Sequence, residues 1–115
     1  MGKVVDGYKE FVRLANENAE AKGLMAGWDK IVQFMVTGDD NFYIETKGGK
    51  ATLTLGVHKS PSVTLKGPAD VFGKMLTGEL DQTRAYFAKQ YTIEGSMSDA
   101  MKFGRIGTAL AKARK

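Results

Sequence analysis

The sequence contains no cysteine, a single histidine and only two prolines among its 115 residues. The lack of cysteine excludes disulfides, thiolate metal sites and a cysteine nucleophile. It suits a reducing compartment, and we therefore expect a cytoplasmic protein. No apolar run approaches the roughly 20 residues that a membrane-spanning helix needs. Residues 1–6 lack both the apolar stretch of a signal peptide and the pattern of a myristoylation site.

The charge is mildly basic, with 17 basic and 13 acidic residues and a formal net charge of +4. This balance permits weak attraction to phosphate-bearing surfaces, but it does not indicate a nucleic-acid-binding protein. The apolar fraction of 43% is typical of a globular chain. No linker or repeat interrupts the sequence, so we expect one domain over residues 1–115.

Helical spacing of apolar residues predicts an amphipathic helix over residues 4–22, with Gly23 as its stop. Strands are predicted over residues 30–37, 42–47, 51–58 and 62–66. The third strand alternates Leu53, Leu55 and Val57 with polar residues, and the fourth alternates likewise. Such alternation indicates a sheet with one buried face, which is usually antiparallel.

The remaining elements are mostly helical. Gly67-Pro68 ends the strand pattern, and a short helix follows with Gly78 as its cap. Asp81 is expected to cap a second short helix. A strand over residues 91–94 and a helix over residues 98–113 complete the chain. This order of elements predicts an α+β fold with the helices packed on one face of the sheet.

Six short segments after residue 61 together resemble the sterol carrier protein lipid-transfer family. They are SVTL (62–65), ADVF (69–72), LTGEL (76–80), AYFA (85–88), YTIEG (91–95) and SMSDAMKF (96–103). The resemblance implies a five-stranded, mostly antiparallel sheet and an apolar tunnel between the sheet and the C-terminal helix. It also implies a lipid ligand, such as a fatty acid, a fatty acyl-CoA, a phospholipid or a sterol, and nothing in these residues selects a sterol. The final residues, ARK, do not match a peroxisomal address.

The predicted C-terminal helix carries two glycines, Gly104 and Gly107, beside an apolar stripe. Each glycine costs a helix about 1 kcal/mol relative to alanine. Either close backbone packing or space left for a ligand would explain the pair. The residues expected to line the tunnel are Leu53, Leu55, Val63, Leu65, Phe72, Met75, Leu76, Phe87, Ile93, Met97, Met101, Phe103, Ile106 and Leu110.

Basic residues lie along the same predicted helix and directly after it: Lys102, Arg105, Lys112, Arg114 and Lys115. These cations form either an ordinary solvated helix face or a contact for anionic headgroups, CoA phosphates and membranes.

The sequence gives little support for a catalytic or a metal-binding function. His58 is the only histidine, and no serine–histidine–acid arrangement can be built around it. The Asp39-Asp40 pair lies in a turn without calcium-loop spacing, so we expect no metal and no cofactor. Three hypotheses remain: a non-catalytic lipid carrier, which we favour, an accessory protein-interaction domain with a collapsed tunnel, and a small enzyme acting on acyl-CoA.

Overall fold

The computed structural model describes residues 2–113. Its elements are α1 (Lys3–Ala15), α2 (Ala19–Met25), β1 (Ile31–Thr37), β2 (Phe42–Lys47), β3 (Lys50–Leu55), β4 (Val63–Pro68), α3 (Ala69–Thr77), α4 (Gln82–Phe87), β5 (Thr92–Gly95) and α5 (Met97–Ala113). Within residues 2–113, no helix is both long and apolar enough to cross a membrane.

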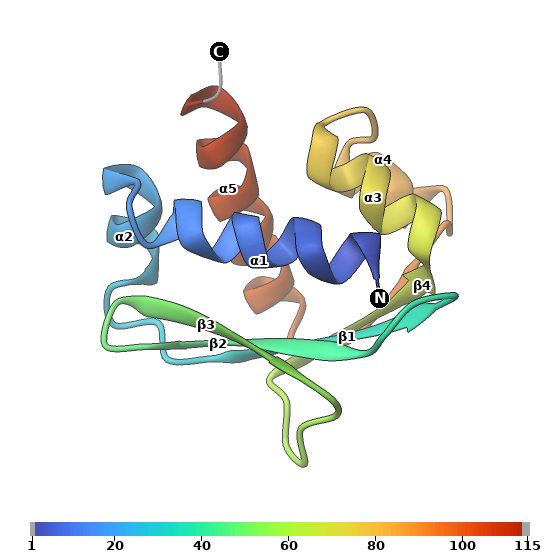
Figure 1. The fold of residues 1–115 in the computed structure, drawn as a ribbon, viewed down its shortest axis with the longest axis horizontal. Helices are drawn as coiled ribbons and strands as arrows, with labels where there is room; N and C mark the ends of the chain where they lie inside the picture. The colour runs from blue at the N-terminus through green and yellow to red at the C-terminus, as the bar shows by residue number, and fades with distance from the viewer. Residues whose placement is uncertain (1, 114–115) are drawn as a thin grey trace.

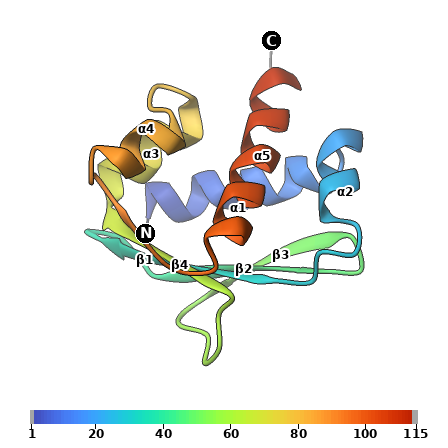
Figure 2. The same ribbon diagram turned by 180° about the vertical axis from the view of Figure 1, so that it is seen from behind.

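The five strands form one sheet in the order β3-β2-β1-β4-β5. All neighbouring strands run antiparallel except β1 and β4, which are parallel. Every helix lies on the same side of the sheet (Figures 1 and 2). The predicted α+β fold, a mostly antiparallel sheet with helices on one face, is therefore confirmed.

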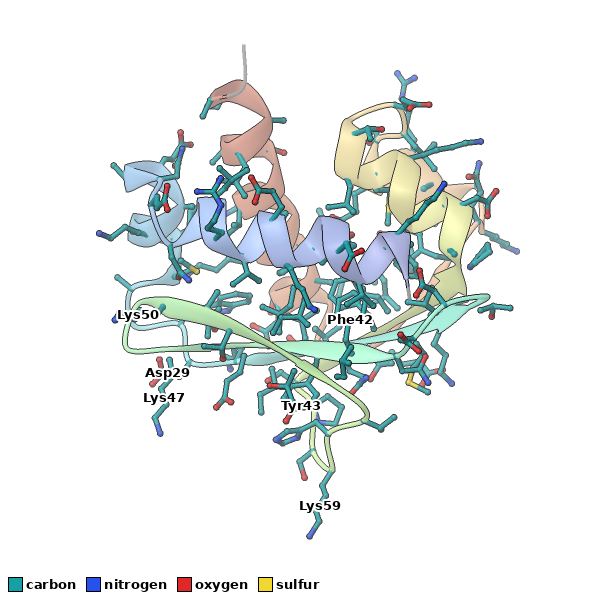
Figure 3. All side chains as sticks on the ribbon, viewed as in Figure 1. Asp29, Phe42, Tyr43, Lys47, Lys50 and Lys59 are labelled. Atoms are coloured by element: carbon teal, nitrogen blue, oxygen red, sulfur yellow. The ribbon has the colours of Figure 1, made fainter. Side chains whose placement is uncertain are left out.

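An aromatic cluster joins the sheet to α1. Phe34 of β1 and Phe42 of β2 are opposite each other in the register and stack with their ring centroids 4.6 Å apart. Tyr8 of α1 lies over both rings, at 4.7 Å from Phe34 and 5.4 Å from Phe42. All three side chains are buried. Figure 3 shows Phe42 on the helix side of the sheet and its neighbour Tyr43 on the opposite side, as strand alternation requires.

The predicted single helix over residues 4–22 is wrong in one respect, because the chain breaks it into α1 and α2. Asn18 caps α2 by accepting a hydrogen bond from the backbone N–H of Ala21. Asn16 turns its side chain to the edge strand β3, where it both donates to the carbonyl and accepts from the N–H of Ala51. Gly23 lies inside α2 instead of ending the helix.

The third predicted strand is also too long. β3 ends at Leu55, and Gly56 takes a positive φ of 113° that turns the chain away from the sheet. Leu55 and Val57 are consequently exposed rather than on a buried face. The loop that follows hangs on the side of the sheet away from the helices, with Lys59 at its tip (Figure 3).

Buried Gln33 of β1 holds this loop in place. Its amide group donates to the Gly56 carbonyl at 3.0 Å, and its carbonyl oxygen accepts from the His58 N–H at 2.8 Å. The amide also donates to the carbonyl of Phe42. These hydrogen bonds satisfy the polar groups of the buried Gln33 amide and attach the loop to the sheet.

The first turn of α5 is tied to the end of the α2–β1 connection. The buried indole Nε1 of Trp28 donates to Oδ1 of Asp99 at 3.0 Å. Lys30 lies 3.8 Å from the other carboxylate oxygen. These contacts fix where α5 leaves the sheet, so the helix rises beside α3 and α4 in the position seen in Figure 2.

Candidate functional site

A cavity of about 350 Å³ lies between α5 and the helices around it, and we call it the α5 cavity. Its walls come from α1, α3, α4 and α5 and from residues 78–81, which connect α3 to α4. No strand residue within the described chain lines it. Figure 2 shows α5 standing beside the α3–α4 pair, with α1 crossing behind both. The cavity therefore opens among the helices, to one side of α5, and not between the sheet and α5, where the sequence predicted a tunnel.

The two glycines of α5 face this space. A Cβ on Gly107 would lie 3.6 Å from Cε2 of Phe11, which is an ordinary van der Waals distance. A Cβ on Gly104 would approach the side-chain amide of Gln82 at 3.1 Å. Both glycines line the cavity. Close packing against Gln82 therefore explains Gly104, whereas a Cβ on Gly107 would fit against Phe11 and take space from the cavity.

Aromatic rings form the inner wall of the cavity. Phe11 of α1 and Phe103 of α5 stack at 5.2 Å, and Tyr8 lies 5.5 Å from Phe11. Phe103 in turn packs edge-on against Phe34 of the sheet. Burial raises the pKa of Tyr8 well above its usual range, so its phenol stays neutral. An apolar, uncharged wall of this kind suits an alkyl chain.

Polar groups gather at the other side, where α4 meets α5. The side chain of Gln82 donates from Nε2 to the backbone carbonyl of Ala100, and the backbone carbonyl of Gln82 accepts from the hydroxyl of Tyr91. Asp81 caps α4 by accepting a hydrogen bond from the backbone N–H of Arg84, so the predicted cap is confirmed. Arg105, exposed on α5, also lines this side and brings a positive charge to it. The cavity therefore has an apolar interior and a polar rim.

The residues predicted to line a tunnel fall into three groups. Five of them line the α5 cavity: Met75, Leu76, Met101, Phe103 and Leu110. Others fill the core between sheet and helices or pack against it: Val63, Leu65, Phe72, Ile106, Leu53 and Ile93. The remainder are exposed on the surface: Leu55, Phe87 and Met97.

Several lining residues did not appear in the sequence-based set. Tyr8 and Phe11 come from α1, whose apolar spacing predicted only a buried face. Asp81, Gln82 and Thr83 line the rim because α4 packs against α5. The only local signal for the site was the glycine pair in α5, and no sequence pattern indicated which helix would face it.

The basic residues of the C-terminal helix have different surroundings. Lys112 forms an ion pair with Glu20 of α2 at 3.5 Å. Lys102 lies over the Trp28 ring, 5.7 Å from its centroid. Arg105 alone of these lines the cavity. Arg114 and Lys115 lie outside the described residues.

The candidate catalytic and metal residues lie elsewhere. His58 accepts a hydrogen bond from the N–H of Ser60 through Nδ1 and packs edge-on against Tyr43, on the outer face of the sheet. It does not line the cavity. In the part of the chain that the structure describes, no group of three or more His, Cys, Asp or Glu side chains is placed to hold a metal ion.

A family model described as the SCP-2 sterol transfer family matches residues 9–107. No curated protein matches the chain. Among solved structures, sterol carrier protein domain 2 of Helicoverpa armigera is similar over 95% of this chain and 89% of that one, with a TM-score of 0.77 and 23% identity.

Two further solved structures have the same fold. The palmitated SCP2L2 of Aedes aegypti has a TM-score of 0.60 and 18% identity, over 69% of this chain and 72% of that one. The inverting sec-alkylsulfatase Pisa1 from a Pseudomonas species has a TM-score of 0.64 and 16% identity. The similarity covers 76% of this chain but 14% of the sulfatase, so the fold also occurs as a part of an enzyme.

Proposed function

Because the chain belongs to the SCP-2 sterol transfer family, whose domains in general bind or transfer lipids without catalysis, we propose that it carries a fatty acid or fatty acyl-CoA in the α5 cavity and is not itself an enzyme. The α5 cavity carries this proposal, because it combines about 350 Å³ of space with an aromatic wall and a polar rim. Ligand sites usually span about 300–1,000 Å³ and have this mixture of apolar walls and a few polar groups.

The expected affinity follows from burial of the chain. A fully buried palmitate tail gains on the order of 12 kcal/mol, at about 0.8 kcal/mol for each methylene. Immobilising the ligand and ordering its surroundings remove about half of that. The remainder, about 6 kcal/mol, corresponds to a dissociation constant of tens of micromolar, which suits a carrier that must also release its lipid.

The ligand's carboxylate or phosphate is expected at the rim beside Arg105. A guanidinium binds such groups through paired hydrogen bonds. The palmitated state of the Aedes aegypti protein supports an acyl ligand for this fold. The position of His58 on the far face of the sheet supports a binding role without acid–base chemistry.

Native mass spectrometry of the purified chain tests the proposal, together with displacement of a fluorescent fatty acid. We expect palmitate to bind with a dissociation constant of tens of micromolar. Arg105→Gln should weaken the binding of palmitate but not of hexadecanol, which lacks the carboxylate. Lys112→Gln is the matched control, because Lys112 pairs with Glu20 and does not line the cavity. Absence of bound lipid and of any displacement at tens of micromolar would instead favour the protein-interaction alternative.

Transient contact with an anionic membrane is a second part of the proposal. Phe87 is 75% exposed at the end of α4, and Met101, which lines the cavity, is 45% exposed. Arg105 lies on the same side of α5 as the cavity. Exposed apolar side chains together with basic residues are typical of proteins that touch the lipid interface. Flotation with vesicles containing phosphatidylserine should decrease for Phe87→Ser and remain unchanged for Val57→Ser, which removes an exposed apolar residue on the opposite side of the sheet.

A further inference from the structure

A second hollow, of about 700 Å³, lies between α1 and α3, and we call it the α1–α3 groove. It runs along the first half of α1 and is bordered by the turn between β1 and β2. Figure 1 shows these segments together, with the start of α1 beside α3 and the sheet below. Leu76 lines both this groove and the α5 cavity, and no other described residue is shared by the two. The two hollows therefore meet at Leu76.

The contact across this meeting point is a leucine on α3 against a glycine on α1. A Cβ on Gly7 would lie 2.6 Å from Cδ1 of Leu76, closer than real side chains approach. Leu76 thus occupies space that exists because Gly7 has no side chain. The Leu76 side chain is only partly buried.

We propose that the α1–α3 groove is a second acyl subsite and that Leu76 is the gate between this groove and the α5 cavity. Leu76 then determines the length of the acyl chain that is bound. This inference rests on the proposed function. The cavity alone lies at the lower limit of ordinary ligand sites, whereas cavity and groove together provide room for a longer chain. The ligand class is a long-chain, unbranched fatty acid or its thioester.

The charges at the two ends give the ligand one orientation. The groove is bordered by four acidic residues and one lysine: Glu10, Asp39, Asp40, Asp70 and Lys3. Glu10 forms an ion pair with Arg13, so the net negative charge comes mainly from the three aspartates. Asp39 accepts from the backbone N–H of Val4, at the start of α1. A carboxylate is disfavoured beside these groups and favoured at Arg105. At the rim of the α5 cavity, Asp81 accepts the capping hydrogen bond from the N–H of Arg84, and Arg105 carries the positive charge. The methyl end of the chain therefore points into the groove.

A chain-length series tests the gate. We expect the affinity of the wild-type chain for octanoate, laurate, palmitate and arachidate to rise with length until the tail reaches Leu76. Leu76→Ala should extend the rise to longer chains, with a gain of at most about fourfold for each further methylene that enters the groove. Leu76→Phe should end the rise at a shorter chain.

Two further variants separate gating from a general effect on the fold. Met75→Ala removes a neighbouring side chain that lines the cavity but not the groove, and it should change all affinities by a similar factor. Gly7→Ala keeps the leucine at position 76 but adds a methyl group that presses on its Cδ1 and fills the space between α1 and α3. It should weaken arachidate more than laurate. Circular dichroism and thermal unfolding establish that each variant is folded.

The outcomes distinguish the two proposals. If fatty acids bind but affinity rises to the same length in the wild type, Leu76→Ala and Leu76→Phe, the gate is refuted while the carrier function stands. If no fatty acid of any length binds the wild-type chain, the carrier function itself is refuted, and the second subsite with it.

Discussion

Replacing Gly107 with alanine should stabilise the protein and weaken its lipid binding at the same time. Gly107 lies inside α5, where glycine costs roughly 0.5–1 kcal/mol relative to alanine. The added Cβ would meet Cε2 of Phe11 at 3.6 Å, which requires no rearrangement. The same methyl group would project into the α5 cavity and take space from a ligand.

Both magnitudes follow from this geometry. The gain in helix propensity amounts to about 0.5–1 kcal/mol, which is about 2–4 °C in the unfolding midpoint of a domain this size. One methyl group in the cavity displaces about one methylene of the ligand, or ~0.8 kcal/mol of burial. The dissociation constant for palmitate should therefore rise about fourfold.

Thermal unfolding and fatty-acid displacement on the same samples provide the assay. Gly23→Ala is the matched control, because Gly23 lies inside α2, a Cβ there meets nothing within 4 Å, and it lines neither hollow. It should give a similar stabilisation with unchanged binding. Gly104→Ala should stabilise less than Gly107→Ala, because its Cβ crowds the amide of Gln82. The reasoning is refuted if Gly107→Ala and Gly23→Ala have equal palmitate affinities.

Three further predictions concern the scaffold. Asp99→Ala leaves the buried indole N–H of Trp28 without its partner and should lower the free energy of unfolding in urea by about 1–3 kcal/mol. Asp99→Asn keeps an acceptor and should cost less. Equal losses for the two variants would contradict the role of Asp99 as the acceptor for Trp28. Gln33→Leu should speed hydrogen exchange at the His58 amide without changing palmitate affinity, and unaltered exchange would mean that Gln33 does not hold the loop. Burial raises the pKa of Tyr91 to about 12, so the folded state holds this proton more tightly than the unfolded state, whose tyrosine pKa is about 10. The free energy of unfolding should then be unaffected by Tyr91 below about pH 10 and should fall as the pH rises toward 12. Urea midpoints measured over this range should fall less for Tyr91→Phe than for the wild type. If ultraviolet absorbance showed every tyrosine titrating near pH 10, the raised pKa would be contradicted.

Elements with local signals could be predicted from the sequence. The cap at Asp81 depends on a hydrogen bond only three residues away, and Gly78 takes the left-handed φ of 84° that favours glycine at a helix end. The alternation of Val63 and Leu65 placed both on the buried face of β4. Each of these features is decided within one element, so spacing and residue type suffice.

Features decided by distant contacts could not be predicted. The break after α1 depends on Asn16 reaching Ala51, 35 residues away. Leu55 continues the alternation of β3 but stays exposed because the chain turns at Gly56. The glycines of α5 signalled a site, yet its position depended on where residues 78–83 pack. Periodicity gives the face of a helix but not the neighbour that covers it.

The side chain of Asn16 also has a consequence for association between molecules. β3 is an outer strand, and unpaired peptide groups on such a strand can recruit a strand from another chain. Here one asparagine supplies both the donor and the acceptor that an incoming strand would have offered at Ala51. A helix-terminating residue thereby also protects this border of the sheet against intermolecular strand pairing.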